Sequence, residues 1–534
     1  MRKLIYWLIV AGASLFACVL GEGKTIVIYG HSVPITKLSP DRGTFLYYAS
    51  GYEAAHLIYD MLVNPDNNMN LCPGLAVSWE FLGKEGDVYA WLFHLRQNVF
   101  FHNGDPFNAE VVAWNVERWM DPEWYPTDRG FRDPIAGVEI IDQYTVKIVT
   151  KIPFAELPRA LMFGGHAVVD PALYEKYGPE WYAINPVGTG PYKVSAFRVG
   201  EELVLTANDE YWGGRPSVDM IIFKYLPDPE ARVRALLAKE VDVIDKVPPH
   251  LAMYLEAYPG FRVEKVIGSR TISLFCNLTR EPLSDRRVRQ AISLIVPREA
   301  IAKQLFFGAA MPADSHLTPA LAGYISVGSP KQDINSALAL LAEAGWRDTD
   351  GDGMLDRDGA PLKLTLLVPD GVFSMDVRVG EVVAASLEAV GIKVEMLKVE
   401  VAAYWPELRR PPSAVKWDIA LFGLLPAQGG SWHVVDALFH SKYQDLTQDM
   451  PPVDWNISRY MNAEVDALID VARDTLDQVT FLNAMARIQE ILWNDMPSIP
   501  LYYDVFITAA QSKIKGPLYW TNGFLVLNNI SVKP

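Results

Sequence analysis

The sequence predicts an α/β fold with more than one domain, on three observations. Segments typical of strands alternate with segments typical of helices in two long blocks, the second beginning near Ser273. The chain has 534 residues, which is too long for one ordinary domain. Half of its residues are apolar, so the chain has enough apolar residues for two or three sizeable cores.

Composition excludes one class of partner. The chain has 48 basic and 64 acidic residues, which gives a net charge of −16. This balance argues against a nucleic-acid-binding protein, which needs a basic face to contact phosphates. Aromatic residues make up 11% of the chain, including 15 Trp and 24 Tyr, which is consistent with large cores and with rings that line a site. Beyond the first 23 residues only Cys72 and Cys276 remain, which predicts two buried thiols rather than a disulfide framework or a metal site, with a single bridge between the two as the alternative in an exported protein.

The N-terminus has the pattern of an export signal. Arg2 and Lys3 precede an apolar run from Leu4 to Leu20, and we expect residues 1–23 to be a secretory signal. The residues Leu15-Phe16-Ala17-Cys18 approximate a bacterial lipobox, in which Cys18 would be acylated. Ordinary cleavage near Gly23 and a retained signal are the alternatives. No later stretch is apolar and long enough to span a bilayer, so the mature protein should be soluble or tethered at its N-terminus.

The first block opens with a strand, Lys24–Gly30, and a helix, Gly51–Val63. Period-two alternation predicts a strand over Tyr89–Leu95, followed by a second short strand over Val99–His102. The turn residues Asn-Gly-Asp-Pro then break the pattern. The period next changes to three or four over Phe107–Trp119, which predicts an amphipathic helix.

The second block contains the clearest helix, Asp333–Gly345. Asp333 or Asn335 would cap it, and Gly345 would end it in the left-handed conformation. Leu338, Leu340 and Leu341 would form its buried stripe.

A βαβ unit follows, with strands Leu362–Val368 and Lys393–Val399 flanking a helix over Val377–Val390. Asp418–Phe439 has the pattern of a strand, a long polar and glycine-rich loop, and a helix. A last helix begins near Phe481 and leads into a strand at Ile499–Tyr503.

Several motifs resemble those of one family, the family 5 extracellular solute-binding proteins. That family includes the oligopeptide-, dipeptide-, glutathione- and nickel-chelate-binding components of ABC importers. The stretch Tyr89–Trp119 resembles the block HLRxGVxFHDGxPFxAEDVxxxxxR. The other matching stretches are Leu71–Glu80 (LxPxLAxSWE), Asn185–Val194 (PVGTGPYxV), Asn208–Pro216 (NxxYWGGxP) and Pro282–Ile301 (PFxDxRVRQAIxxAIDRxxI).

The resemblance implies a two-lobed α/β fold of the periplasmic-binding-protein type II, with three subdomains and a hinge of two crossovers. Lobe I would comprise residues 24–276 and 497–534, with an inserted subdomain at about 55–185, and lobe II residues 277–496. The protein would capture a peptide or similar small ligand between the lobes and deliver it to a membrane permease. We expect a bacterial monomer in the periplasm or anchored to the cell envelope, without a cofactor.

Candidate ligand contacts also follow from the resemblance. Peptide-binding relatives grip the free amine of the peptide with an aspartate in the loop within Asp418–Phe439, and this loop lacks an equivalent unless Asp436 acts. Arg129 or Arg132 would hold an anionic group, since a guanidinium matches a carboxylate in two-pronged fashion, although both also fit surface arginines. The full set of expected ligand residues is Tyr47, Ser50, Gly51, Arg129, Phe131, Arg132, Phe422, Gly423, Ser431, Trp432 and His433.

An acidic loop suggests a second kind of site. Asp348, Asp350 and Asp352 alternate with Thr and Gly, and Asp356 falls at the ninth position, as in the start of a calcium loop. Gly359 stands where such a loop needs a bidentate glutamate. A solvated acidic turn is therefore the favoured interpretation and calcium the alternative.

Other functions stay open at this point. No His-Glu-x-x-His spacing, Gly-x-Ser-x-Gly elbow or Walker loop is present, so a secreted hydrolase is an alternative without a catalytic motif. His94 and His102 fit structural histidines better. Nickel or another metal chelate and oligosaccharide remain alternatives to a peptide ligand, and a sensor or chaperone-like binding protein would share the fold.

Overall fold

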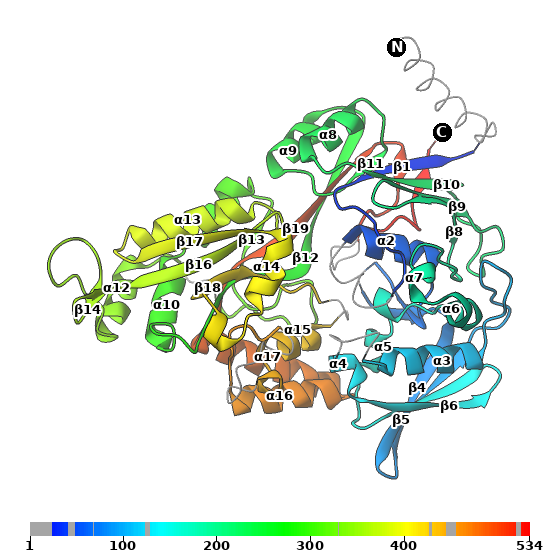
Figure 1. Cartoon of the computed structure of the whole chain (residues 1–534), viewed down its shortest axis with the longest axis horizontal. Helices are drawn as coiled ribbons and strands as arrows, with labels where there is room; N and C mark the ends of the chain where they lie inside the picture. The colour runs from blue at the N-terminus through cyan, green and yellow to red at the C-terminus, as the bar shows by residue number, and fades with distance from the viewer. Residues whose placement is uncertain are drawn as a thin grey trace.

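The computed structural model describes residues 24–40, 49–67, 69–122, 129–328, 331–426, 430–444, 455–519 and 525–533. Two long strands, β12 (Phe261–Cys276) and β19 (Ser498–Gln511), run antiparallel through the middle of the molecule and link its two halves (Figure 1). We name them the hinge strands. Lobe I and lobe II below denote the residue ranges predicted from the sequence, and that division stays a prediction.

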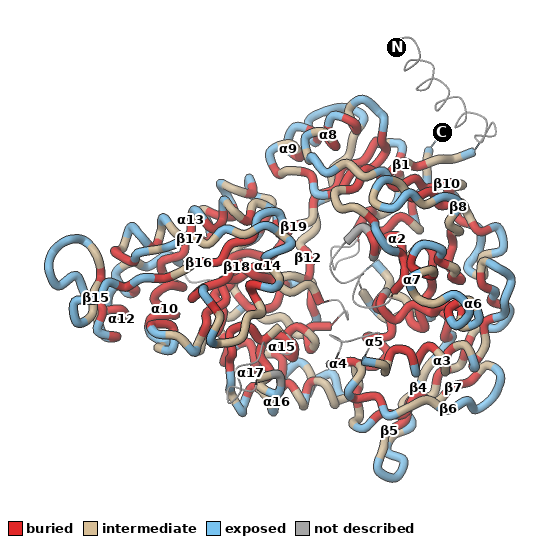
Figure 2. The backbone as a smooth tube through the Cα atoms, viewed as in Figure 1, coloured by how far each residue is buried: buried red, intermediate tan, exposed pale blue. Residues whose placement is uncertain are grey.

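One sheet passes through the hinge strands from lobe I into lobe II, in the order β17-β16-β18-β12-β19-β11-β1-β10-β9-β8. β11 (Val243–Ile244) pairs with the last part of β19, whereas β18 (Ile419–Phe422) pairs with the last part of β12. The register between the hinge strands shifts between Ile267 and Thr271. Such an irregularity bends a strand, so the sheet can bend where the two lobes join. β19 is buried almost throughout (Figure 2).

Lobe I is built around β1 (Ile26–His31), which confirms the predicted opening strand. β1 lies parallel to both β10 (Met220–Tyr225) and β11. α8 (Pro229–Leu237) connects β10 with β11 and returns the chain from the carboxyl ends of these strands to their amino ends. Parallel strands end at one edge of a sheet, so the residues that follow β1, β10 and β11 lie together.

A separate antiparallel sheet, β4-β5-β7-β6, forms the inserted subdomain, and α3 packs against it. The predicted strand over Tyr89–Leu95 and the predicted helix after Phe107 are confirmed as β5 and α3. Asn108 caps α3 by accepting the N–H of Val111 at 3.1 Å. The bounds are β4 (Ala76–Glu85), β5 (Val88–Leu95), α3 (Ala109–Met120), β6 (Ile135–Asp142) and β7 (Thr145–Thr150).

The prediction of a strand over Val99–His102 is wrong. Only a single bridge joins Phe100 to Pro106. The N–H of Phe101 is instead bonded to the carbonyl of Asp105 at 2.8 Å, because the Asn-Gly-Asp-Pro turn folds the chain straight back. The alternating pattern there comes from side chains that pack on the core without a neighbouring strand.

Lobe II contains the predicted βαβ unit. β16 (Lys363–Asp370) lies parallel to β17 (Lys393–Glu400), and α13 (Asp376–Glu388) crosses between them. The predicted caps of α12 (Ile334–Glu343) are confirmed: Asp333 accepts the N–H of Ser336 at 3.0 Å, and Gly345 has φ +90°.

The buried stripe predicted for α12 is wrong in one position. Leu341 is fully buried and Leu340 half-buried, but Leu338 is 37% exposed. The helix buries a narrow face, with Ala337 and Leu341 one turn apart, and Leu338 lies outside it.

Other described elements complete the two lobes. In lobe I these are α2 (Ala49–Ile58), β2 (Val63–Pro65), β3 (Leu71–Pro73), α4 (Arg129–Arg132), α5 (Leu157–Ala160), α6 (Pro171–Tyr177), α7 (Pro179–Tyr182), β8 (Tyr192–Arg198), β9 (Glu202–Ala207), α9 (Pro249–Ala257), β20 (Ile514–Lys515) and β21 (Ser531–Val532). In lobe II they are α10 (Arg286–Ile295), α11 (Arg298–Ala300), β13 (Met311–Pro312), β14 (Asp356–Arg357), β15 (Ala360–Pro361), α14 (Val401–Leu408), α15 (Ser431–Phe439), α16 (Ala463–Asp474) and α17 (Gln478–Asp495).

The family-like motifs of lobe I meet around one buried carboxylate, Asp60. It accepts hydrogen bonds from the Thr189 hydroxyl at 2.9 Å, the Tyr211 hydroxyl at 3.0 Å and the Trp212 indole N–H at 2.7 Å. The Arg96 guanidinium lies over the Trp212 ring at 4.1 Å. Motifs far apart in the sequence therefore form one structural network.

His102 belongs to the same network. Its Nε2 lies 3.0 Å from the carbonyl of Gly190, and its Nδ1 accepts the N–H of Gly188 at 3.4 Å. Burial lowers the pKa of His102 to about 4. The structure thus confirms His102 as a structural histidine that is held neutral.

A second buried histidine makes stability depend on pH. In lobe II, Nε2 of His316 lies 3.0 Å from the carbonyl of Ser498, and burial lowers the pKa of His316 from 6.5 to about 4. As pH falls below 6.5 the unfolded chain takes up this proton before the folded chain does, so folding stability is lost between pH 6.5 and 4.

We expect this histidine to remove about 3 kcal/mol of stability by pH 4. The replacement His316→Gln, which keeps a side-chain N–H donor, should flatten the dependence of the urea midpoint on pH in that window. An unchanged slope in the variant would contradict the assignment.

Candidate functional site

Strand ends in lobe I bring several polar side chains together at one edge of the sheet. β1 leads into Ser32 and β11 leads into Asp245, and the Ser32 hydroxyl donates to the Asp245 carboxylate at 2.6 Å. α2 lies beside this edge, where Glu53 accepts a hydrogen bond from the Tyr29 hydroxyl at 2.9 Å. Ligands of α/β proteins bind outside the carboxyl ends of parallel strands, so this edge is a candidate binding wall.

Charges on this wall are strongly desolvated. Burial raises the pKa of the Glu53 carboxyl well above its usual range, and the nearby Asp245 carboxylate raises it further. The hydrogen bond from Tyr29 opposes both effects. The environment therefore favours the protonated form of Glu53.

Strand ends in lobe II meet the same place from the other side. β18 ends at Phe422, and a Cβ on Gly423 would lie 2.7 Å from the Thr271 carbonyl and 3.0 Å from Cγ of Arg270. Only glycine allows this approach to the hinge strand. Arg270 itself pairs with Asp504 of the other hinge strand, Nε to Oδ2 at 2.8 Å, and lies over the Phe373 ring at 5.0 Å. The strand ends of both lobes thus converge on the hinge strands.

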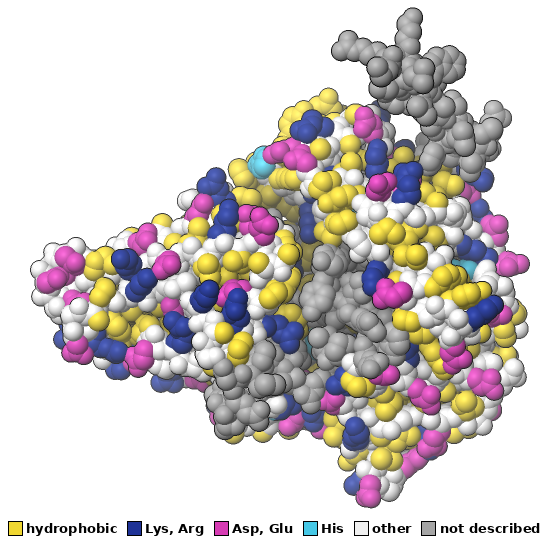
Figure 3. Space-filling view, viewed as in Figure 1, with side chains coloured by type: hydrophobic (Ala, Val, Ile, Leu, Met, Phe, Trp, Pro, Cys, Tyr) yellow, Lys and Arg dark blue, Asp and Glu magenta, His cyan; other side chains and the backbone are white. Residues whose placement is uncertain are grey.

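A cavity of about 330 Å³ lies between the inserted subdomain and lobe II. Its walls contain the ion pair of Glu156 and Arg159, with Oε2 and Nε 3.3 Å apart. Burial raises the pKa of Glu156, and the Arg159 guanidinium opposes the rise. Other lining residues are Met69, Asn70, Ala155, Ser269, Leu321, Pro426, Gly430, Ser431, Leu476, Asp477, Gln478 and Phe481. The space-filling view shows a hollow between the lobes, with residues that the structure does not describe drawn in grey (Figure 3).

The two lobes touch beside this cavity. The ring of Phe154 in lobe I meets the ring of Trp432 in lobe II edge to face, with centroids 5.9 Å apart. The N–H of Ala155 donates to the carbonyl of Arg473 at 3.0 Å. A Cβ on Gly430 would lie 2.9 Å from Oε2 of Glu156. These contacts join lobe I to lobe II, as in a closed arrangement of the lobes.

Four of the predicted ligand residues lie at this junction. Gly423 contacts the hinge, Ser431 lines the cavity, and Trp432 joins the lobes. Phe422 is buried and stacks on Trp455 at 5.7 Å. Ser431 and Trp432 begin helix α15, which follows the polar and glycine-rich loop.

Other predicted residues are placed differently. Phe131 is 1% exposed and packs on His166 with ring centroids 3.8 Å apart, within the core of the inserted subdomain. Arg132 pairs with Asp133 at 3.3 Å. Gly51 is buried in α2, and His433 is half-buried on α15. Tyr47 lies outside the described residues, as do the side chains of Ser50 and Arg129. Their roles as ligand contacts stay predictions.

Asp436, the alternative partner for a free amine, already has a partner. It is 1% exposed, and Nζ of Lys442 lies 2.6 Å from its Oδ1. Residues that the sequence analysis missed are Glu53, Asp245 and Arg270. The rule that ligands gather at the carboxyl ends of strands points to Asp245, because it directly follows β11.

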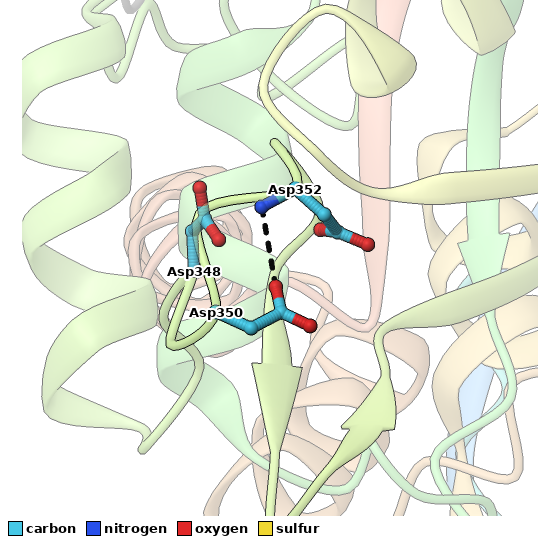
Figure 4. Close-up of side chains that lie close together, drawn as sticks. All are labelled: Asp348, Asp350 and Asp352. Atoms are coloured by element: carbon cyan, nitrogen blue, oxygen red, sulfur yellow. Dashed lines mark hydrogen bonds between the residues drawn. The ribbon is translucent and has the colours of Figure 1, made fainter.

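The acidic loop is distant in sequence from this junction. Oxygens of Asp348, Asp350 and Asp352 lie within 4.8 Å of one another (Figure 4). Each of these aspartates also accepts backbone N–H groups of the loop: Asp348 those of Gly351 and Gly353, at 2.8 and 3.1 Å. Asp356 is bonded to Thr349. The carboxylates thus stabilise the turn through the chain itself.

We therefore expect calcium removal to leave stability unchanged. Chelation with EGTA should shift the melting temperature by less than about 1 °C, because the loop's own N–H groups satisfy its carboxylates. Differential scanning fluorimetry with and without added calcium measures this. A rise of several degrees on calcium addition, lost in Asp350→Asn, would establish the calcium alternative.

No helix in the described ranges is both long enough and apolar enough to cross a membrane.

A family profile described as "Bacterial extracellular solute-binding proteins, family 5 Middle" matches residues 70–445. The chain is 27% identical to Di/tripeptide-binding protein 2 of Pseudomonas aeruginosa, over 96% of this chain and 95% of that protein. It is also 27% identical to glutathione-binding protein GsiB of Escherichia coli, over 96% and 94%.

Solved structures share the fold. The oligopeptide-binding protein AppA of Bacillus subtilis, in complex with a nonapeptide, matches with a TM-score of 0.79 at 23% identity, over 96% of this chain and all of AppA. NikA of Brucella suis, in complex with Fe(III)-EDTA, matches with a TM-score of 0.82 at 23% identity, over 95% of this chain and all of NikA. The mixed α/β, two-lobed fold predicted from the sequence is confirmed. The chain belongs to the family 5 bacterial extracellular solute-binding proteins, which bind solutes and are not enzymes.

Proposed function

We propose that this protein captures a peptide, or a small ligand with peptide-like groups, in the crevice between its lobes. The observation that carries the proposal is the convergence of strand ends from both lobes on the hinge strands, beside a cavity of about 330 Å³. Concave sites of this kind, with a few placed polar groups, are typical of ligand pockets. The residues expected from the sequence at Phe422, Gly423, Ser431 and Trp432 belong to this site.

Closure of the lobes over the ligand is the step that serves transport. The ligand favours the closed form only through its higher affinity for that form. The closed form would then dock on the membrane permease of an ABC importer, the partner that the family implies. The lobe boundaries near residues 276 and 497 fit this motion, because both fall at ends of the hinge strands.

A peptide is the favoured class of ligand, because two relatives that align over most of the chain are a di/tripeptide-binding protein and a glutathione-binding protein. A metal chelate and an oligosaccharide remain the alternatives.

Mass spectrometry of the protein released from cells under native and denaturing conditions identifies what co-purifies. Calorimetry with trialanine, glutathione, nickel with histidine, and cellotetraose then ranks the classes. We expect a peptide to bind with micromolar or better affinity. Binding of nickel-histidine or cellotetraose alone would replace the peptide proposal, and no binding by any probe would leave it without support.

We also propose export and N-terminal anchoring. Family membership places the protein outside the cytoplasm, and residues 15–18 carry the lipobox-like pattern. The expected result is that metabolic palmitate labels the wild type but not Cys18→Ala. Cleavage near Gly23 in both proteins, found by N-terminal sequencing, would contradict acylation.

A further inference from the structure

Lys246 occupies an unusual position at the crevice edge of lobe I. It is the second residue after β11, and its neighbours Asp245 and Val247 are buried while Lys246 is exposed. Its φ is +43°, in the left-handed region that side chains rarely adopt. A backbone held in this region needs support from its surroundings.

That support comes from one buried guanidinium. Arg232 is 2% exposed and donates to the carbonyls of Leu226 at 2.6 Å and Pro227 at 2.9 Å. It also donates to the carbonyls of Asp245 at 3.3 Å and Lys246 at 3.4 Å. Arg232 therefore ties the end of β10 to the end of β11, and it fixes the turn that presents the Lys246 side chain.

The charges near Lys246 already have partners. Asp245 pairs with Arg232, Oδ1 to Nε at 3.4 Å, and Arg270 pairs with Asp504. Glu53 is bonded to Tyr29, and its environment favours the uncharged form. Among the described residues, the ammonium of Lys246 has neither an ion pair nor a hydrogen bond.

Lys246 is accessible and yet enclosed by protein. Burial lowers its pKa, with the Asp245 carboxylate opposing that effect and the Arg270 guanidinium adding to it. A side chain that water reaches but that protein surrounds lies in a crevice rather than on an outer surface.

We propose that Lys246 binds an acidic group of the ligand, a carboxylate, at the crevice end of β11. An exposed ammonium whose charged neighbours already have partners is free to pair with an incoming anion. A ligand carboxylate supplies that anion, and a fixed backbone lowers the entropy that binding loses. This inference rests on the proposed function. It assigns Lys246 as the residue that binds one group of the ligand, a carboxylate.

The test compares trialanine, which has a free carboxylate, with trialanine amide, which lacks it. Calorimetry with the full mature protein is expected to give at least tenfold tighter binding of trialanine. Lys246→Met should abolish the difference, and Lys246→Arg, which keeps the charge, should retain it. Equal affinities for the two peptides in the wild type, or a preference that survives in Lys246→Met, would overturn the proposal while leaving peptide binding intact.

Lys239→Met is the matched control. Lys239 is also exposed and also has a positive φ, of +61°, but it follows α8 on the way to the amino end of β11, at the opposite edge of the sheet. This variant should behave as the wild type.

If neither peptide binds the wild type, the peptide proposal fails and glutarate decides the role of Lys246. A melting-temperature rise with millimolar glutarate in the wild type and in Lys239→Met, lost in Lys246→Met, supports the carboxylate site. No rise in the wild type, or the same rise in Lys246→Met, overturns it.

Discussion

The variant Gly188→Ala should lower the melting temperature by roughly 6–12 °C, if the destabilisation is about 3 kcal/mol. A Cβ at this position would lie 2.1 Å from the carbonyl oxygen of Ile58. That oxygen belongs to the end of α2 and accepts the N–H of Gly190 at 2.9 Å, so it cannot turn aside like a flexible side chain. Relief of the clash requires α2 to separate from the turn, which disrupts the network around Asp60.

Gly137→Ala is the matched control. Gly137 lies in strand β6, a Cβ there meets nothing within 4 Å, and its φ is not positive. The control should melt within about 1 °C of the wild type, since a strand residue without a clash tolerates a methyl group. Equal melting temperatures for Gly188→Ala and Gly137→Ala, by scanning calorimetry, would show that the turn adjusts more easily than the geometry implies.

Local signals predicted the elements of the fold where one cause dominates. Asp333 caps its helix because a short polar side chain before an apolar period has few other conformations that satisfy the first turn. The βαβ unit was predictable because two strand patterns enclose a helix pattern of the right length. The prediction of a strand over Val99–His102 was wrong, because alternation in sequence also arises where side chains pack on a core without a strand partner.

The candidate site was less predictable, because its parts meet only in three dimensions. Gly423 was expected near ligand, but its contact with Thr271, 152 positions earlier in the chain, follows from sheet order alone. Phe131 shows the converse: an aromatic residue beside two arginines suggests a ligand contact, whereas its ring fills the core against His166. Lys246 carries no motif, and only its backbone conformation and its unpaired charge at the end of β11 single it out.

Trp432 joins the two lobes more directly than any other predicted site residue. It is 2% exposed, and its ring meets Phe154 across the crevice at 5.9 Å. Removal of a buried tryptophan side chain costs about 3–5 kcal/mol in total. Part of that loss falls on the closed form alone, because the contact with Phe154 exists only when the lobes meet. Because the ligand binds to the closed form, a loss of stability in the closed form lowers the affinity for ligand.

We expect Trp432→Ala to weaken binding of the co-purifying ligand at least tenfold, equivalent to about 1.4 kcal/mol of closure energy. Trp417→Ala is the control, because Trp417 is equally buried but lies within lobe II, where its indole N–H donates to the carbonyl of Glu407 at 3.2 Å. The control should lower the melting temperature yet change affinity less than twofold. Calorimetry measures the ligand affinity of each variant, and small-angle scattering measures its radius of gyration with and without ligand. If both variants bind equally well and give the same radius of gyration with ligand, the contact between Trp432 and Phe154 does not stabilise closure.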